Sequence, residues 1–210
     1  MPRTLRFVTP LVVASLIVCA PSTPAVAQTG PTPASLDEVT DGFSAAIKAD
    51  VAKLRAATDA FHDLAKAQAA GYPTTTPTCV ADSTMGGMGR HYLDRNIYDD
   101  KLDIEHPEML IYAPAADGKY QLVGVEYVVP FRLLPDTSKA PRLFGQELRT
   151  HQQYKYWYLH VWAWTKNKAG LFSDWNPAIR CGRLAWRSSC ASALCGHPAR
   201  APSACRSMQL

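Results

Sequence analysis

Apolar residues recur at alternating steps of three and four in the first third of the chain, the spacing of one face of an α-helix. Ser35 and Glu38 have the spacing of a capping box at its start. Gly71 and Pro73 are typical of a helix end, and Gly42 is a place where the helix could break in two. The pattern predicts an amphipathic helix over residues 35–70, with an apolar face made of Leu36, Val39, Phe43, Ile47, Val51, Leu54, Thr58, Phe61 and Ala65.

Three apolar runs further along the chain have the character of β-strands. Residues 108–113 and 119–129 flank the dipeptide Asp117-Gly118, which is typical of a tight hairpin. Residues 154–164 form the third run, the most aromatic of the chain. Residues 85–89, Met-Gly-Gly-Met-Gly, are too rich in glycine for regular structure and predict a loop. The predicted fold is α+β: a long N-terminal amphipathic helix packed on a small, mainly antiparallel sheet.

The beginning of the chain has the pattern of a secretory signal peptide. Residues 1–27 contain two arginines, then a short apolar run, then the small-residue sequence Ala25-Val26-Ala27. The apolar run is shorter than the roughly 20 residues that span a bilayer, so we expect no transmembrane segment in the mature chain. A lipid anchor at Cys19 is the alternative, but Val18 is larger than the residue that such a site prefers. The pattern predicts a secreted protein, extracellular or periplasmic.

The rest of the chain divides into a linker-like lead at residues 28–34, a single domain at 35–181, and a tail at 182–210. The tail contains four arginines and no acidic residue, without helical or strand periodicity, which predicts a disordered basic segment. The spacing of its zinc-ligand residue types fits no common zinc site; these residues are Cys190, Cys195, His197 and Cys205.

Composition and charge exclude two broad classes of protein. With 47% hydrophobic residues, the chain is too apolar to be disordered throughout. The two ends hold six of the 22 basic residues and none of the 18 acidic ones, so residues 28–181 carry 16 basic against 18 acidic residues. The formal charge of +4 therefore belongs to the ends, and we expect no nucleic-acid partner for the domain.

Two of the six cysteines lie inside the predicted domain. Cys79 and Cys181 stand near its two ends. In an exported protein such a pair most simply forms one disulfide bond, although the tail cysteines offer other pairings.

Side chains alternate between the two faces of a strand, which divides the third run into two sets. One set is apolar throughout and suits the helix. The other set presents aromatic rings around one imidazole, and such a face either closes a second layer of core or lines a ligand pocket. Its members, the candidate ligand-binding residues, are Tyr156, Tyr158, His160, Trp162 and Trp164.

Glu126 is a lone carboxylate inside an apolar strand, so it should pair with a cation, bind a metal, become protonated or reach solvent. With His91 and His160 it could coordinate a divalent metal and leave positions open for water or substrate. Separations of 35 and 34 residues carry no local ligand spacing, so convergence depends on the fold. The alternative is a structural cluster in which Glu126 pairs with an arginine or a lysine, the candidates being Arg90, Arg132 and Lys155. Two methionines of the glycine-rich segment, Met85 and Met88, could add thioether ligands suited to Cu(I).

Six short segments occur in a fixed order: GMGRHY, PEMLIY, LVGVEYVVP, LFGQ, YLHVWAW and GLFSDWNP. Together they resemble a family of exported bacterial proteins of uncharacterised function. The resemblance covers about residues 61 to 181 and ends at Cys181. It implies export, but no reaction, so no catalytic role is carried over from it.

Signatures of the common enzyme classes are absent from the sequence: the serine-hydrolase elbow, the His-Glu-x-x-His zinc motif, the phosphate-binding loop, the dinucleotide fingerprint and the Cys-x-x-Cys redox motif. The sequence therefore predicts an exported protein that binds a small molecule or a metal ion through His91, Glu126 and His160. Two other classes stay open. One is a structural or partner-binding envelope protein without a ligand site, and the other is a hydrolase or isomerase with a Glu/His acid–base pair.

Overall fold

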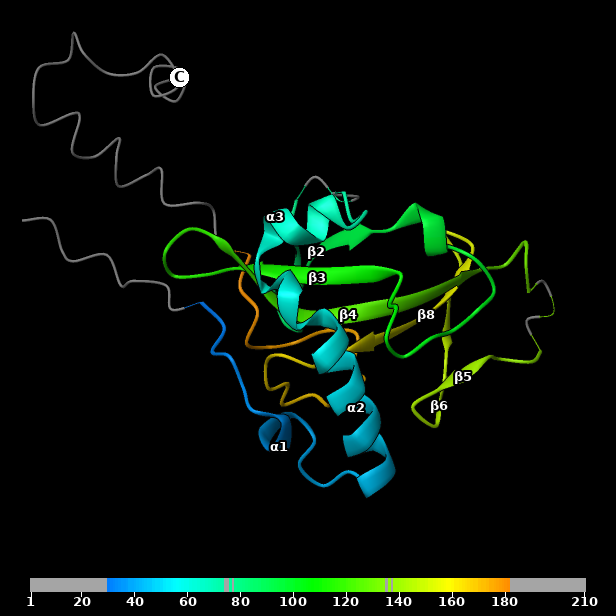
Figure 1. Cartoon of the computed structure of the whole chain (residues 1–210), viewed down its shortest axis with the longest axis horizontal. Coiled ribbons are helices and arrows are strands. Elements are labelled where there is room, and N and C mark those ends of the chain that lie inside the picture. Colours follow the sequence, from blue (N-terminus) through cyan, green and yellow to red (C-terminus); the bar gives the residue numbers. More distant parts are fainter. Residues whose placement is uncertain (1–29, 74–75, 77, 135, 137, 182–210) are drawn as a thin grey trace, which may run out of the picture. The chain divides into compact units, whose positions relative to one another are not determined.

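The apolar stripe near the start of the chain forms three short helices instead of one long helix. The computed structural model describes residues 30–73, 76, 78–134, 136 and 138–181, and these belong to one compact unit. The helices are α1 (Leu36–Val39), α2 (Ala45–Thr58) and α3 (Leu64–Ala69), and a 3-10 turn, η1 (Asp59–His62), continues α2 (Figure 1). The predicted capping box is confirmed, because the Ser35 hydroxyl accepts from the Glu38 amide at 3.3 Å and the Ser35 amide donates to the Glu38 carboxylate at 2.7 Å.

The break that Gly42 predicts is confirmed, a second break follows at Asp63, and polar residues restart the helix after each of them. Gly42 lies in the turn between α1 and α2 and adopts a left-handed conformation, with φ of +78°. The hydroxyl of Ser44 then accepts from the Ile47 amide and begins α2, and the carboxylate of Asp63 accepts from the Ala65 amide and begins α3. Each side chain satisfies a backbone amide that has no partner within its own helix.

A six-stranded antiparallel sheet in the order β1-β2-β3-β4-β8-β7 forms the rest of the domain. A separate two-stranded ribbon contains β5 and β6, and a 3-10 turn, η2 (Arg95–Ile97), follows β2. The predicted hairpin is confirmed, with Gly118 in its turn at φ of +79°. The strands are β1 (Val80–Asp82), β2 (Gly86–Leu93), β3 (Met109–Pro114), β4 (Tyr120–Pro130), β5 (Arg142–Leu143), β6 (Gln146–Glu147), β7 (Arg149–His151) and β8 (Tyr156–Val161).

The glycine-rich segment is a strand, which corrects the prediction of a loop there. Gly86 and Gly87 begin β2 and pair with β1, and Gly87 also pairs with Asn176 of the closing segment. A Cβ on Gly86 would lie 2.3 Å from the carbonyl oxygen of Asn176, and a Cβ on Gly87 would lie 2.6 Å from the side chain of Ile179. Glycine is required at these two positions because the closing segment packs directly against the backbone of the strand and leaves no space for a side chain.

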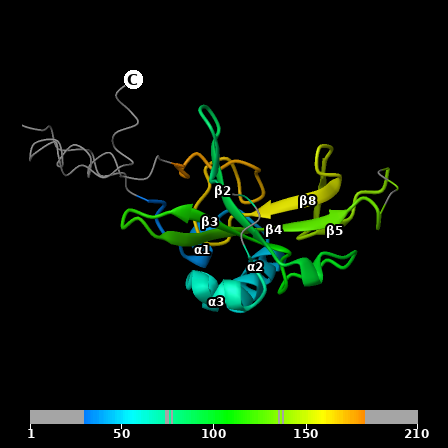
Figure 2. The ribbon, with the colours of Figure 1, turned by 90° about the horizontal axis from the view of Figure 1, so that it is seen from above.

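The helices cover one face of the sheet, and Figure 2 shows them all on the same side of it. The main core lies between these two layers and includes Trp157, Leu159, Val161 and Ala163, as the alternation of the third run predicts. A shift in the pairing of β3 with β4 between Ile111 and Tyr112 changes the alternation along β4. As a result, Leu122 joins the main core while its neighbour Val123 packs on the other face.

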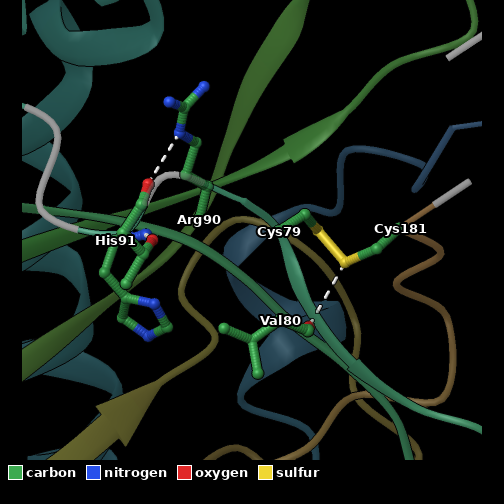
Figure 3. The surroundings of a disulfide bond; sticks show 6 residues. Cys79, Val80, Arg90, His91 and Cys181 are labelled. Carbon is green, nitrogen blue, oxygen red and sulfur yellow. Dashed lines mark hydrogen bonds between the residues drawn. A yellow bond between two sulfur atoms is a disulfide. The ribbon is translucent and has the colours of Figure 1, made fainter. Parts of the chain in front are cut away.

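The opposite face of the sheet carries two smaller apolar clusters. One contains Leu93, Met109 and Val128, packed with three tyrosines. The other contains Ile111, Ala113, Val123 and Trp162, covered by Ile179 of the closing segment. The predicted Cys79–Cys181 disulfide is present and joins this closing segment to the residue before β1 (Figure 3).

The third strand is shorter than the aromatic run that predicts it. β8 ends at Val161, and the chain then turns, so the alternation of faces no longer holds. Trp162 stays on the face opposite the helices, where its indole N–H donates to the carbonyl of Ser173 at 2.7 Å. Trp164 turns to the helix side, into the main core, with the guanidinium of Arg55 4.1 Å from its ring centre.

The described part of the predicted linker lies against the domain. The Ala34 amide donates to the Trp164 carbonyl at 3.0 Å, and the Gln121 side chain donates to the Pro31 carbonyl at 2.5 Å. The predicted signal peptide and tail, with Cys19 and the tail cysteines, lie outside the described residues. Within the described ranges, no helix has the length and apolarity needed to cross a bilayer.

Glu108, directly before β3, is a buried carboxyl that extends the ladder of backbone hydrogen bonds. Its side chain accepts from the Val128 amide at 3.0 Å, beyond the last pair of β3 with β4, and only 1% of the residue is exposed. Burial raises the pKa of Glu108 to about 8, which exceeds the ordinary value of about 4.5 in the unfolded chain. The folded state therefore binds a proton more tightly than the unfolded state does.

We expect the free energy of unfolding to fall as the pH rises from about 4.5 to about 8, by up to about 1.4 kcal/mol per pKa unit. Glu108→Gln, which cannot ionise, should lack this contribution, so that its stability relative to the natural protein rises with pH. Urea unfolding at pH 5, 7 and 8.5 measures the difference. The exposed Glu105→Gln is the matched control, and parallel profiles for the natural protein and Glu108→Gln would contradict the role assigned to Glu108.

Candidate metal centre

Three strands bring the predicted metal ligands together on the sheet face opposite the helices. His91 lies on β2, Glu126 on β4 and His160 on β8. Glu126 and His160 are direct partners in the register of β4 with β8. The side chain of His91 reaches them across β3, where its register partner is Ile111. Alternation places all three on one face, because residues two positions further along β2 and β4, Leu93 and Val128, belong to an apolar cluster on that face.

The three side chains converge on one point. The Nε2 atoms of His91 and His160 are 3.3 Å apart, and they lie 3.5 and 3.7 Å from Oε2 of Glu126. A point equidistant from the three atoms is about 2.0 Å from each, which is the length of a zinc–imidazole bond. The expected convergence of His91, Glu126 and His160 is confirmed, and the group could hold a metal ion.

All three side chains are buried, with exposed fractions of 7% for His91, 3% for Glu126 and 1% for His160. Burial, together with the nearby His160, lowers the pKa of His91 to about 3. The ring of His91 is therefore neutral at neutral pH, which is the form that binds metals. Burial also raises the pKa of Glu126, although the neighbouring His160 opposes this shift. A cation at the centre of the group would favour the ionised carboxylate.

Asp174 stands behind His160, on the side away from the convergence point. Its Oδ1 is 3.7 Å from Nδ1 of His160, a buried atom that lacks a hydrogen-bond partner among the described residues. Arg149 pairs with the carboxylate of Asp174, and the Tyr158 hydroxyl donates to it at 3.1 Å. A carboxylate on this side favours a proton on Nδ1 and leaves the Nε2 lone pair directed at the convergence point, as behind many metal-binding histidines.

A cleft of about 630 Å³ opens directly over the three side chains. Tyr156 and Tyr158 line it together with His91, Glu126 and His160, as the aromatic pattern predicts. Trp162 and Trp164 do not line it, because Trp162 is fully buried beside the cleft and Trp164 lies in the helix-side core. The cleft has the size of an ordinary small-molecule site and exceeds the space needed by an ion with its water.

The basic side chains weighed as structural partners of Glu126 are engaged elsewhere or make no such pair. Nε of Arg90 donates to the Thr76 carbonyl at 3.0 Å, and its guanidinium lies near the rings of Tyr92 and Tyr120. Within the described residues, the charged-group neighbours of Glu126 are the imidazoles of His91 and His160, at 3.5 and 3.7 Å, and neither Arg132 nor Lys155 pairs with it.

The two methionines of the glycine-rich segment differ in their position relative to the cleft. Met85 is 46% exposed, and Met88 lines the cleft. No fourth histidine, cysteine, aspartate or glutamate joins the group within the residues that the structure describes. Among these four residue types, the described group consists of His91, Glu126 and His160.

Asp174 is the residue of this site that sequence reasoning missed. It lies in the segment GLFSDWNP, which is also rich in turn formers and gives no alternation from which its direction could be inferred.

In comparisons with known proteins, no family model, curated protein or solved structure matches the chain.

Proposed function

We propose that this is an exported metal-binding protein that holds one divalent transition-metal ion between His91 Nε2, Glu126 Oε2 and His160 Nε2. The observation that carries the proposal is the spacing of these atoms, 3.3 to 3.7 Å, with a common point about 2.0 Å from each. Zinc bonds to imidazole nitrogen at about 2.0–2.1 Å and to carboxylate oxygen at about 2.0–2.2 Å, so this spacing fits zinc, which we use as the test ion.

Three ligands leave a position of the metal open. Structural zinc sites usually have four protein ligands, whereas sites that bind or activate another molecule have three and a water. Here the group forms part of the wall of the cleft, from which a water or a ligand can reach the ion. The arrangement thus supports an ion that exchanges its fourth ligand instead of one that only fastens the fold.

Export is supported by the signal-like pattern of residues 1–27 and by the Cys79–Cys181 disulfide, since disulfides persist mainly in oxidising compartments. The resemblance to exported bacterial proteins points the same way. Three of the segments that carry it, GMGRHY, LVGVEYVVP and YLHVWAW, each contribute one of the three ligands, and a fourth, GLFSDWNP, contributes Asp174.

Calorimetric titration of zinc into the chelator-treated, dialysed protein tests the proposal. We expect one equivalent to bind tightly to the natural protein and this equivalent to be lost in Glu126→Gln and His160→Gln, which keep the size of the side chains approximately. His106→Ala removes an exposed imidazole and is the matched control. Elemental analysis of the same samples counts the bound ion.

Cysteine thiolates are zinc ligands, so the test compares variants in order to separate any zinc bound by the tail cysteines from zinc bound at Glu126. A Cys190→Ser/Cys195→Ser/Cys205→Ser variant should keep the equivalent that Glu126→Gln loses. Equal zinc binding by the natural protein and Glu126→Gln would overturn the proposal and favour a structural cluster of buried, hydrogen-bonded side chains.

A further inference from the structure

We propose that the cleft over the metal centre binds a small aromatic carboxylate, with one carboxylate oxygen on the open position of the metal and the ring among the tyrosines. This inference rests on the proposed metal site and adds the class of molecule that the site receives. It follows from the volume of the cleft, from its aromatic side chains and from its charged groups.

The volume of the cleft favours an organic ligand over a hydrated ion alone. A volume of about 630 Å³ lies within the range of small-molecule sites, whereas a metal-bound water occupies only about 30 Å³. The cleft is bordered by apolar side chains, Leu93 and Met109 among them, that a hydrated ion alone would not need. A ligand that fills the cleft must therefore offer apolar surface as well as a group for the metal.

The rings of the cleft form a continuous aromatic wall. Tyr154 stacks on His151, with centroids 4.6 Å apart, and lies nearly parallel to Tyr156 at 6.0 Å. Tyr156 meets Tyr158 edge to face at 6.2 Å, and Tyr158 meets His160 at 5.7 Å. Tyr154 is 62% exposed, so the wall runs from the surface to the proposed metal ligand. A planar aromatic body can stack against or meet the edges of such rings.

The charges of the cleft favour an anion. A divalent ion with one carboxylate and two neutral imidazoles leaves the centre with one net positive charge. Asp174 is neutralised by Arg149, whose guanidinium pairs with it. Arg95 lines the cleft and is exposed there, and its guanidinium has no ion pair or hydrogen bond within the described part of the chain. A carboxylate would interact favourably with both positive charges, that of the metal centre and that of Arg95, whereas a neutral alcohol or sugar would neutralise neither.

Tyrosine hydroxyls add hydrogen-bond donors to this side of the cleft. Those of Tyr98, Tyr154 and Tyr156 have no acceptor among the described residues, unlike that of Tyr158, which donates to Asp174. A carboxylate has up to four acceptor positions, so it can bind the metal and accept from a hydroxyl or from Arg95 at the same time. Donor groups without partners in a cleft favour a ligand rich in acceptors.

The experiment uses benzoate as the probe and benzyl alcohol as its neutral counterpart. We expect benzoate to bind to the zinc-loaded protein at least about tenfold more tightly than to the metal-free protein, and benzyl alcohol to bind at least about tenfold more weakly than benzoate. In protein loaded with Co²⁺ instead of Zn²⁺, benzoate should change the visible absorption bands, because they report the ligands of the ion directly.

Arg95→Ala should weaken benzoate binding about fivefold without changing zinc binding or the melting temperature, because this side chain is exposed and touches the ligand alone. Arg180→Ala, which removes an exposed arginine outside the cleft, is the matched control and should leave benzoate binding unchanged.

The failures of the two proposals are distinguishable. If zinc does not bind in the first step, the metal proposal fails and this inference fails with it. If zinc binds but benzoate binds no better than benzyl alcohol, or leaves the cobalt spectrum unchanged, the metal site stands and the aromatic carboxylate is overturned. Equal effects of Arg95→Ala and Arg180→Ala would remove the assigned role of Arg95.

Discussion

Saturating zinc should raise the melting temperature of the metal-free protein by about 8–16 °C. An ion that binds the folded chain alone at a concentration 1,000 times its dissociation constant adds about 4.1 kcal/mol to the free energy of unfolding. For a domain of this size, each kcal/mol raises the melting temperature by about 2–4 °C. Scanning calorimetry with and without zinc, in a buffer that does not bind the ion, measures the shift.

Glu126→Gln should have opposite consequences in the two states. In the metal-free protein the ionised carboxylate is buried against two imidazoles, and burial raises its pKa, so replacing it with a neutral amide should leave the melting temperature unchanged or raise it. With zinc present, the natural protein should gain stability while the variant should not. The natural protein should therefore have the higher melting temperature of the two only when zinc is present.

The exposed His106→Ala is the control for nonspecific loss of imidazole, and it should keep the full zinc shift. An equal zinc shift in the natural protein and in Glu126→Gln would show that zinc acts elsewhere in the chain, for example at the tail cysteines. The Cys190→Ser/Cys195→Ser/Cys205→Ser variant identifies that source directly.

Removal of the Cys79–Cys181 disulfide should lower the free energy of unfolding by about 2–4 kcal/mol. The two cysteines are 102 residues apart in the chain, so the bond removes much of the freedom of the unfolded state in the chain-entropy model. We expect the melting temperature of Cys79→Ser/Cys181→Ser to fall by about 4–16 °C. A reducing agent should lower the melting temperature of the natural protein and leave that of the double variant unchanged; equal sensitivity of both would contradict the assignment of the bond.

The same variant should bind zinc more weakly, because the bond fastens one wall of the site. Cys79 stands between Val80, which lines the cleft, and Thr76, whose hydroxyl accepts from the backbone amide of His91 at 3.1 Å. Val80, directly after Cys79, pairs with Gly89 of β2, two residues before His91. Loss of the bond therefore loosens the segment that fixes the backbone of one proposed ligand.

Hairpin and helix ends were predictable because their signals are local. Asp117-Gly118 fixes the β3–β4 turn through the backbone freedom of one glycine, and Ser35 with Glu38 fixes a helix start through two hydrogen bonds. The glycine-rich segment was misassigned because its glycines serve a distant contact. Gly86 and Gly87 make room for Asn176 and Ile179, about 90 residues further on, and no local pattern reveals that crossing.

The three proposed ligands could be selected by residue type, since Glu126 and His160 interrupt strands that are otherwise apolar or aromatic. Their convergence could not be derived, because it depends on the strand order β2-β3-β4-β8 and on the register that pairs Glu126 with His160. Trp164 was placed on the wrong face because β8 ends three residues before it, and alternation predicts direction only within a strand.

The placement of His91, Glu126 and His160 on strands that meet only through the complete sheet also bears on the order of events during folding. No local turn brings any two of these residues together, so the unfolded chain has no preformed metal site. Zinc-finger domains differ, because their ligands lie in short segments that fold around the ion. The ion can bind to all three residues only after β2, β3, β4 and β8 have paired. The ion should therefore prolong the lifetime of the native state by slowing escape from it, with little effect on the rate at which the chain first arrives there.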